Sequence, residues 1–293
     1  MTRRALLLFV AMSVIWGLPY LFIRIAVSDL SPVVLVFART AIGALILLPI
    51  ALARGEVRGL LKSWMPLVAF AAVEIGIPWF MISSAEQKIT SSLAGLLVSA
   101  VPLVGLVIAV ALGNREHLGL TSVSGLLLGV VGVAAIGGFD LKASGWLPLA
   151  EMGVVVVCYA GGPAILSRYL SEEPAVGVNA VSLTLCAVAY APLALVQWPH
   201  SVPPVDAIVA VIVLAVVCTA LAFLLFFALI AEIGPVRATV ITYINPAVAA
   251  VLGVMVLHEN FTAGMAIGFV LVLAGSVLAT RRPEPRKVNQ AFN

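Results

Sequence analysis

Two charged side chains, Arg39 and Glu74, lie inside long apolar stretches of the sequence. If those stretches cross a membrane, an unpaired charge inside one costs at least about 2.5 kcal/mol. An ion pair between Arg39 and Glu74 on neighbouring helices would offset this cost, and Glu74 could instead carry a proton. We expect a structural role for Arg39, and both interpretations of Glu74 stay open.

Glycine and proline occur together at two matching places, Gly17 with Pro19, and Gly161 and Gly162 with Pro163. Proline removes a main-chain donor, and the carbonyl groups freed in this way can line a substrate site. In inverted-repeat transporters, such helix breaks mark the substrate site and the hinge. Close helix packing at glycine and a simple proline kink are the alternative. We expect Pro19, Gly162 and Pro163 beside a substrate and Gly17 and Gly161 at a hinge.

Pro102 and Pro246 form a second matched pair, each near the middle of an apolar stretch. A proline there should bend its helix. We expect the two bends to shape gates that open and close, with a static kink as an equal alternative.

Aromatic side chains in the inner parts of these stretches could form walls for an apolar or aromatic ligand, although aromatic residues that face lipid are common. Hydroxyl and amide groups could hold a zwitterionic head group, although Ser and Thr in membrane helices often bond to their own backbone. The aromatic candidates are Trp16, Tyr20, Trp79, Phe80, Tyr159, Phe223, Phe227 and Tyr243. The polar candidates are Ser83, Ser99, Thr242 and Asn245.

The sequence lacks the motifs of an intramembrane enzyme or an ATPase. It has no Gly-x-Ser-x-Gly nucleophile with a membrane histidine, no His-Glu-x-x-His metal site, no paired intramembrane aspartates and no Walker A motif. We therefore expect no catalysis, no cofactor, no metal ion and no nucleic-acid partner.

The composition shows which elements must position these residues. Of the 293 residues, 63% are hydrophobic and 10% are charged, against about 45–50% and 25% in soluble domains. A helix needs about 20 apolar residues to cross a bilayer. The sequence therefore predicts an all-α membrane protein with ten transmembrane helices, at 5–26, 32–53, 64–84, 90–111, 119–137, 146–168, 177–196, 206–230, 235–256 and 263–280.

Spacings repeat between the two halves of the chain. Glu116 is followed by glycine at 125 and 132, and Glu259 by glycine at 268 and 275. These matches align spans one to five, in 5–137, with spans six to ten, in 146–280. Because five is an odd number, the second copy must enter the membrane upside down, which predicts two inverted five-helix repeats around a central cavity.

Lysine and arginine predict the orientation, because they concentrate on cytoplasmic loops. With both termini in the cytoplasm, the far side holds only Arg24, Lys88 and Lys142, and 281–293 is a basic cytoplasmic tail. The cytoplasmic side then holds Arg3, Arg4, Arg54, Arg58, Lys62, Arg115, Arg168, Arg237, Arg281, Arg282, Arg286 and Lys287.

Several segments resemble a known family. The first span reads Val14-Ile15-Trp16-Gly17-Leu18-Pro19-Tyr20, Arg39 follows Ser31-Pro32, and each half closes with a proline, a loop glutamate and a glycine-rich helix. This pattern resembles the EamA branch of the drug/metabolite transporter superfamily, and within it bacterial exporters of aromatic and other apolar amino acids. The resemblance implies alternating access around a central cavity, in a bacterial inner membrane.

The expected function is therefore export of small apolar metabolites, foremost aromatic and other hydrophobic amino acids, with one copy of the chain sufficient for transport. Transport of a different metabolite or a drug in the same fold is the first alternative. Only Arg39 offers a positive charge inside a span, which argues against phosphate-bearing substrates. A passive pore or a membrane scaffold is the second alternative.

Overall fold

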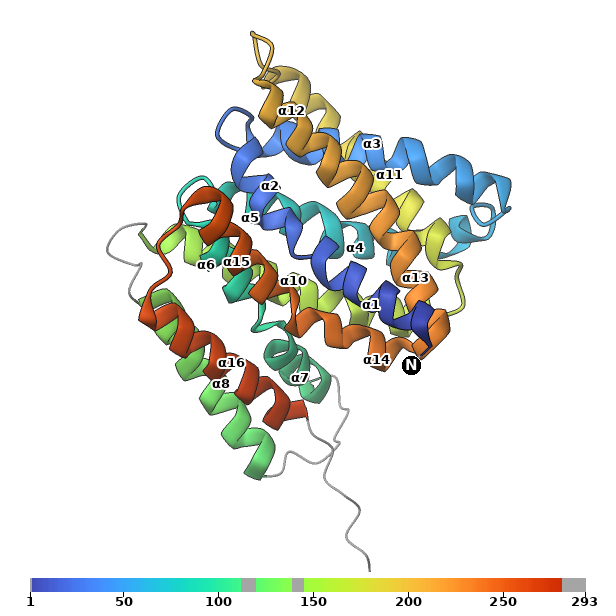
Figure 1. Cartoon of the computed structure of the whole chain (residues 1–293). Coiled ribbons are helices and arrows are strands. Elements are labelled where there is room, and N and C mark those ends of the chain that lie inside the picture. The colour runs from blue at the N-terminus through green and yellow to red at the C-terminus, as the bar shows by residue number, and fades with distance from the viewer. Residues whose placement is uncertain (1, 112–119, 139–144, 281–293) are drawn as a thin grey trace, which may run out of the picture.

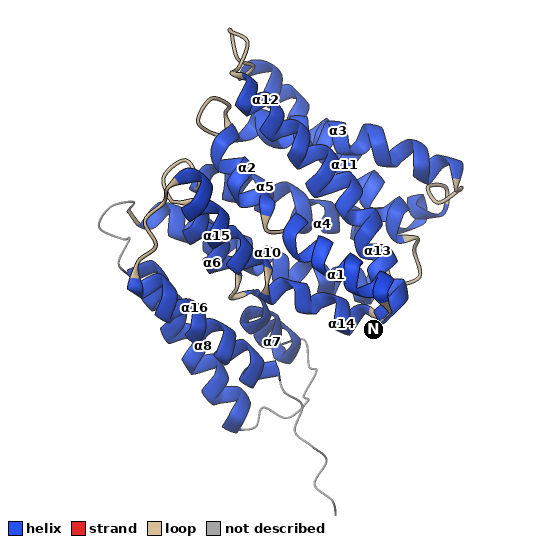
Figure 2. Cartoon of the chain, viewed as in Figure 1, coloured by secondary structure: helices blue, strands red, loops and turns tan. Residues whose placement is uncertain are grey.

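The computed structural model describes residues 2–111, 120–138 and 145–280, and these residues form helices joined by short loops, with no strand among them (Figures 1 and 2). The elements before residue 140 are α1 (Arg3–Ile15), α2 (Leu18–Ala26), α3 (Pro32–Ala53), η1 (Gly59–Ser63), α4 (Trp64–Phe70), η2 (Ala71–Gly76), α5 (Ile77–Ala85), α6 (Ser91–Val98), α7 (Val101–Ala111) and α8 (Leu120–Gly138). The later elements are α10 (Trp146–Tyr169), α11 (Ala175–Val196), α12 (Val205–Ile212), η3 (Val213–Leu221), α13 (Ala222–Ile233), α14 (Pro235–Ala238), η4 (Thr239–Tyr243), α15 (Asn245–Leu257) and α16 (Ala263–Thr280).

Eight helical stretches of the described chain are long and apolar enough to cross a membrane, which supports the predicted all-helical membrane fold. Two shorter apolar helices, Thr121–Ile136 and Ala263–Ala279, lie where the fifth and tenth spans were expected. The eight stretches are Arg3–Ala26, Pro32–Ala53, Trp64–Ala85, Ser91–Ala111, Trp146–Tyr169, Ala175–Val196, Val205–Ile233 and Val240–Leu257. The tail 281–293 and Glu116 lie outside the described residues.

Three of the four singled-out prolines follow an interruption of their helix. Pro19 is the second residue of α2, Pro102 the second residue of α7 and Pro246 the second residue of α15. In this position proline needs no main-chain donor, so it begins the second helical piece. The fourth, Pro163, lies within α10, which runs on without a break. The helix break expected at Pro163 is therefore absent. A proline removes one main-chain hydrogen bond from the helix, and the apolar surroundings favour keeping the remaining main-chain hydrogen bonds.

Two of the eight stretches contain a π-helical segment, η2 within Trp64–Ala85 and η3 within Val205–Ile233. A π segment replaces the regular i to i−4 ladder, and such segments often occur at functional sites. Side chains of α11 bond to carbonyl groups of η2. The Cys186 thiol lies 3.3 Å from the Ala71 oxygen, and the Tyr190 hydroxyl donates to the Gly76 oxygen at 3.0 Å.

Helices α8 and α16 pack backbone to backbone at one edge of the molecule (Figure 1). A Cβ atom on Gly125 would lie 2.7 Å from the carbonyl oxygen of Gly275, and one on Gly132 would lie 2.7 Å from that of Gly268. Only glycine permits so close an approach. The earlier glycine of α8 contacts the later glycine of α16, so the two helices run antiparallel.

The other helices make a paired pattern of contacts. Helix α3 packs against α11, α6 against α15, and α5 against α10, while α1 and α2 pack against α13 and α12. Every one of these pairs joins a helix before residue 140 to one after residue 145. The hydrophobic core is thus shared between the two halves of the chain.

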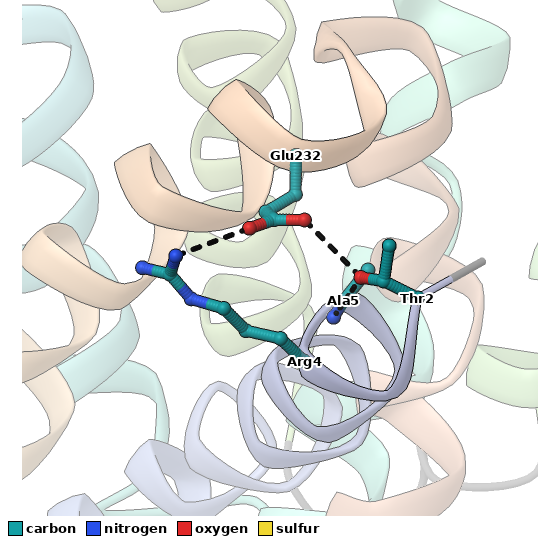
Figure 3. A network of polar contacts seen from close by, with 4 residues as sticks. All are labelled: Thr2, Arg4, Ala5 and Glu232. Atoms are coloured by element: carbon teal, nitrogen blue, oxygen red, sulfur yellow. Dashed lines mark hydrogen bonds and ion pairs between the residues drawn. The ribbon is translucent and has the colours of Figure 1, made fainter.

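Polar contacts fasten the helix ends. At the N-terminus, Glu232 at the end of α13 lies 3.3 Å from Arg4 and accepts a 3.2 Å hydrogen bond from the Thr2 hydroxyl (Figure 3). The same hydroxyl caps α1 by accepting from the Ala5 amide at 3.0 Å. At this end of the bundle, these contacts therefore join α1 to α13.

Loop glutamates also bind helix N-termini across the two halves. Glu259, after α15, accepts hydrogen bonds from the Ser91 and Ser92 amides of α6 at 2.8 and 2.9 Å. Glu56, after α3, accepts from the Gly177 amide of α11 at 3.0 Å. A carboxylate is favourable there because the first amides of a helix lack partners and carry partial positive charge.

Candidate functional site

Arg39 on α3 is buried, with 6% of its surface exposed, and it meets two other spans. Its Nε donates to the Thr219 hydroxyl of η3 at 3.0 Å, and its Cζ lies 3.6 Å from the centroid of the Trp79 ring on α5. Among the described residues, no carboxylate lies within 4.0 Å of its guanidinium. The predicted ion pair between Arg39 and Glu74 was therefore wrong, because the Thr219 hydroxyl and the Trp79 ring contact the guanidinium in place of a carboxylate.

Thr219 was not among the residues expected from the sequence. Its hydroxyl accepts from Arg39 and donates to the Leu214 carbonyl of its own π segment at 2.8 Å. A hydroxyl that donates and accepts at once links an irregular backbone to a buried charge. The available signal was its polarity in the middle of the apolar stretch Val205–Ile233.

Glu74 lies in the other π segment, η2, against α10. Its Oε2 is fully covered and has no hydrogen-bond partner among the described residues. A methyl group on Gly162 would overlap this oxygen, whereas one on Gly161 would meet only Val73, at an ordinary 3.5 Å. Gly162 therefore makes the room that the Glu74 carboxyl occupies.

Tyr159 connects the two charged residues. It is half-buried on α10, interacts electrostatically with both Arg39 and Glu74, and lies within side-chain hydrogen-bond reach of Trp79. The buried Tyr20 of α2 interacts electrostatically with Tyr159 in turn. We call this group the central cluster; its members are Tyr20, Arg39, Glu74, Trp79, Tyr159, Gly162 and Thr219.

Other aromatic candidates adjoin the central cluster. Phe223 and Phe227 of α13 stack with centroids 6.3 Å apart and pack against the hydrophobic core that contains Trp79. The ring centroid of Trp16, at the end of α1, lies 6.4 Å from that of Phe223. Phe80 stacks on Tyr190 at 6.3 Å. Aromatic side chains of α5 and α11 thus form one stacked pair, and those of α13 and α1 form a second group.

The two serine candidates use their protons locally. The Ser83 hydroxyl donates to the Trp79 carbonyl at 2.6 Å, and the Ser99 hydroxyl donates to the Leu96 carbonyl. Both are buried and bonded to their own helical segments, as the alternative interpretation of such residues holds. Each hydroxyl can still accept a hydrogen bond.

The polar and aromatic candidates in η4 and α15 lie toward α1. With its amide oriented to donate, the Asn245 nitrogen lies 3.0 Å from the Ser13 carbonyl and 2.9 Å from the Ile241 carbonyl. Thr242 is exposed and Tyr243 is half-buried, both in η4. Asn245 therefore ties α15 to α1 and satisfies carbonyl groups beside two helix interruptions.

The glycine–proline candidates have different surroundings. Gly17 lies in the turn between α1 and α2, where a Cβ atom would come within 2.6 Å of Val248 on α15. Pro19 is half-buried, whereas Pro163 is exposed on the surface of α10. The ring of Pro163 is thus turned outward, although its neighbour Gly162 belongs to the central cluster.

Two cavities are described, and the central cluster lines neither. One of about 670 Å³ lies at one end of the bundle, among Arg24, Gln87, Thr90, Asp206 and Glu259. The other, of about 460 Å³, lies between α3 and the loop that leads to α12. Because Arg39 and Trp79 are each only 6% exposed, the described conformation is closed around the central cluster.

Comparisons with known proteins agree with this architecture. The model of the EamA-like transporter family matches residues 3–138 and 152–281. The uncharacterized transporter YvbV of Bacillus subtilis strain 168 is 26% identical, over 98% of this chain and 94% of its own. The uncharacterized inner membrane transporter YedA of Escherichia coli strain K12 is 24% identical, over 93% of this chain and 92% of its own.

The fold has a counterpart among solved structures. A protein crystal structure that is 22% identical in sequence superposes with a TM-score of 0.68, over 94% of this chain and 96% of that chain. The all-helical fold and the match of the family model over both ranges agree with one another. The chain therefore belongs to the EamA-like transporter family, within the drug/metabolite transporter superfamily.

Proposed function

We propose that this membrane transporter exports small, largely apolar metabolites, foremost aromatic and other hydrophobic amino acids, by alternating access. The observation that carries the proposal is that Arg39 and Glu74 do not pair, although Tyr159 interacts with both. A buried cation and a separate carboxyl group, beside aromatic side chains, suit a zwitterion that has an apolar side chain.

Arg39 is suited to the carboxylate of such a substrate. Its Nε is occupied by Thr219, but its two terminal amino groups form no hydrogen bond with the described residues. A guanidinium can bind a carboxylate through two parallel hydrogen bonds. Trp79 holds the guanidinium in place without neutralising its charge.

Glu74 is suited to the ammonium group. Its covered Oε2 lacks a partner among the described residues, and an ammonium ion donates the hydrogen bonds that a carboxylate needs. The same feature favours the alternative of a cationic drug, which would use Glu74 and leave Arg39 idle. A phosphate-bearing substrate fits less well, because Arg39 is the one cation of the cluster.

The proposed architecture is ten transmembrane helices in two inverted repeats, with both termini cytoplasmic and one copy sufficient. Two features support it. The aligned glycines meet in swapped order, Gly125 with Gly275 and Gly132 with Gly268. The π segments occupy the third and eighth spans, which are the same place in each half. A bacterial inner membrane is proposed from the lysine and arginine bias and from the similarity to the inner membrane transporter YedA of Escherichia coli.

Alternating access requires segments that can bend on either side of a closed centre. The interruptions before Pro102 and Pro246, and the turn at Gly17, supply candidate bending points. A passive pore would have no need for a charged cluster that is closed on itself.

Counterflow in liposomes that contain the purified protein tests the proposal. Vesicles preloaded with phenylalanine should accumulate labelled phenylalanine and leucine, but neither phenylalanine methyl ester, which lacks the carboxylate, nor N-acetylphenylalanine, which lacks the ammonium. Exchange of the ester alone would identify a cation transporter. Equal uptake by vesicles without preloaded substrate would identify a pore, and no exchange of either amino acid would reject this substrate class.

A further inference from the structure

Glu86 directly follows α5, and its carboxyl group is buried without a hydrogen-bond partner among the described residues. None of the Glu86 surface is exposed, and both carboxyl oxygens are covered. Burial raises the pKa of the Glu86 carboxyl well above its usual range; Glu259 adds to the rise and Arg24 opposes it. A charged carboxylate in this environment would be strongly disfavoured, so the described conformation is that of the neutral acid.

The surroundings of Glu86 connect it to water. Arg24 of α2 donates from its terminal amino group to the main-chain oxygen of Glu86. Arg24, Glu259 and the exposed Gln87 all line the cavity of about 670 Å³. A small movement of the Glu86 side chain toward Arg24 would therefore bring its carboxyl to the cavity.

Apart from Arg24, the described side chains that neighbouring helices place near Glu86 are acidic or neutral. Tyr20 of α2 interacts with it electrostatically. Glu151 of α10 accepts a 2.7 Å hydrogen bond from Ser84, two residues before Glu86, and Asp206 of α12 lies at the cavity wall. The exposed Lys88 follows two residues later in the same turn, whereas Arg24 bonds to the main chain of Glu86 itself. A charged Glu86 would thus be drawn toward Arg24.

We propose that Glu86 is a proton-binding site, and that loss of its proton opens this end of the bundle. On deprotonation the carboxyl O–H bond breaks, the proton passes to water in the cavity, and the carboxylate moves from its buried position to Arg24. Glu86 lies at the turn from α5 to α6, so this movement displaces the N-terminus of α6. The new charge also repels Glu259, which holds that N-terminus through the Ser91 amide.

Proton binding at Glu86 would also affect transport, a step that rests on the proposed function. A proton bound in the closed form and released in the open form would link the proton gradient to the opening of one side. Proton binding itself does not depend on the substrate, so the two proposals can fail separately.

Infrared titration of the full-length protein in liposomes tests the site. Because the covered carboxyl of Glu74 can also hold a proton, the titration uses Glu74→Gln as its background. That protein should show the carbonyl band of a protonated carboxylic acid at pH values above the ordinary carboxyl pKa, and adding Glu86→Gln should remove the band. The exposed Glu172→Gln is the matched control and should keep it. Arg24→Gln should move the midpoint up and Glu259→Gln should move it down. A band that survives Glu86→Gln, or a midpoint in the ordinary range, would overturn the proposal.

Thiol labelling tests the opening. A cysteine at the buried Ser91, the first residue of α6, should react faster as pH rises, beyond the change shown by a cysteine at the exposed Ser201, and Glu86→Gln should abolish the excess. Counterflow of phenylalanine should likewise depend on pH in the wild type and not in Glu86→Gln. Excess labelling that persists in Glu86→Gln would refute the coupling to Glu86, whereas absent counterflow at every pH would refute only the substrate assignment.

Discussion

The Cζ atom of Arg39 lies 3.6 Å from the centroid of the Trp79 ring. Together with the 3.0 Å hydrogen bond to Thr219, this contact accommodates a buried cation without a counter-ion. A desolvated cation–π contact is worth about 2 kcal/mol, so it offsets much of the cost of the charge. The positive charge is held in place and stays available to an anionic group.

Thr219→Val tests how the charge is held. Valine keeps the shape of threonine but removes the acceptor for Arg39, and a buried hydrogen bond to a charged group is worth about 1.5–3 kcal/mol. We expect the free energy of unfolding in detergent to fall by about that amount. Thr184→Val is the matched control, because the Thr184 hydroxyl bonds only to the Ala180 carbonyl of its own helix; an equal loss in both variants would contradict the role of Thr219.

Gly162→Ala tests the position of the Glu74 carboxyl. The added methyl group would overlap Oε2 and displace the carboxyl, so we expect counterflow to fall at least about tenfold, as displaced binding groups commonly cost. Gly161→Ala adds the same methyl group one residue earlier, where it would meet only Val73 at 3.5 Å. That variant should transport normally, and comparable losses in both would show that helix α10, rather than Glu74, is the sensitive feature.

Gly125→Ala tests the contact between α8 and α16. Its Cβ atom would lie 2.5 Å from the Ala279 nitrogen and 2.7 Å from the Gly275 oxygen, and backbone atoms cannot turn aside. Overpacking of this kind costs about 1–3 kcal/mol, so the thermal midpoint in detergent should drop. Gly105→Ala, on α7, meets nothing within 4 Å and should be neutral or slightly stabilising. Matching behaviour of the two variants would argue against a tight interface.

The pH dependence of stability should include a contribution from Glu86. Its folded-state pKa is raised, chiefly by burial, so the folded protein keeps a proton that the unfolded chain has lost. Folding then takes up a proton, and stability should fall as pH rises above about 4.3, the ordinary glutamate value. Differential scanning measurements across pH should show a shallower decline for Glu86→Gln than for the wild type, and parallel profiles would speak against a buried neutral acid.

The sequence predicted the helices and many of their interruptions. Apolar length alone places the spans, and the prolines at 19, 102 and 246 each begin a helical piece where a break was expected. The glycines at 125 and 132 were found by their spacing, and they pack against the matching pair in α16 in swapped order, Gly125 with Gly275 and Gly132 with Gly268. These features are local, so the sequence carries them directly.

Contacts between distant residues could not be predicted in the same way. The stretches are apolar on all sides, so no periodicity shows which side of a helix is turned inward. Arg39 therefore seemed to need Glu74, whereas its partner Thr219 lies 180 positions away. Glu86 stands in a polar triplet with Gln87 and Lys88 that is typical of an exposed loop, yet it is fully buried.

The π segments determine which side chains can meet at all. A turn of π-helix holds an extra residue compared with an α-helical turn, and each residue rotates an α-helix by about 100°. Trp79 follows η2, so its direction depends on that insertion. A regular α-helix with the same number of residues would rotate Trp79 by about 100°, away from Arg39. The direction of Trp79 is thus set by how this span is wound as well as by which residues it contains.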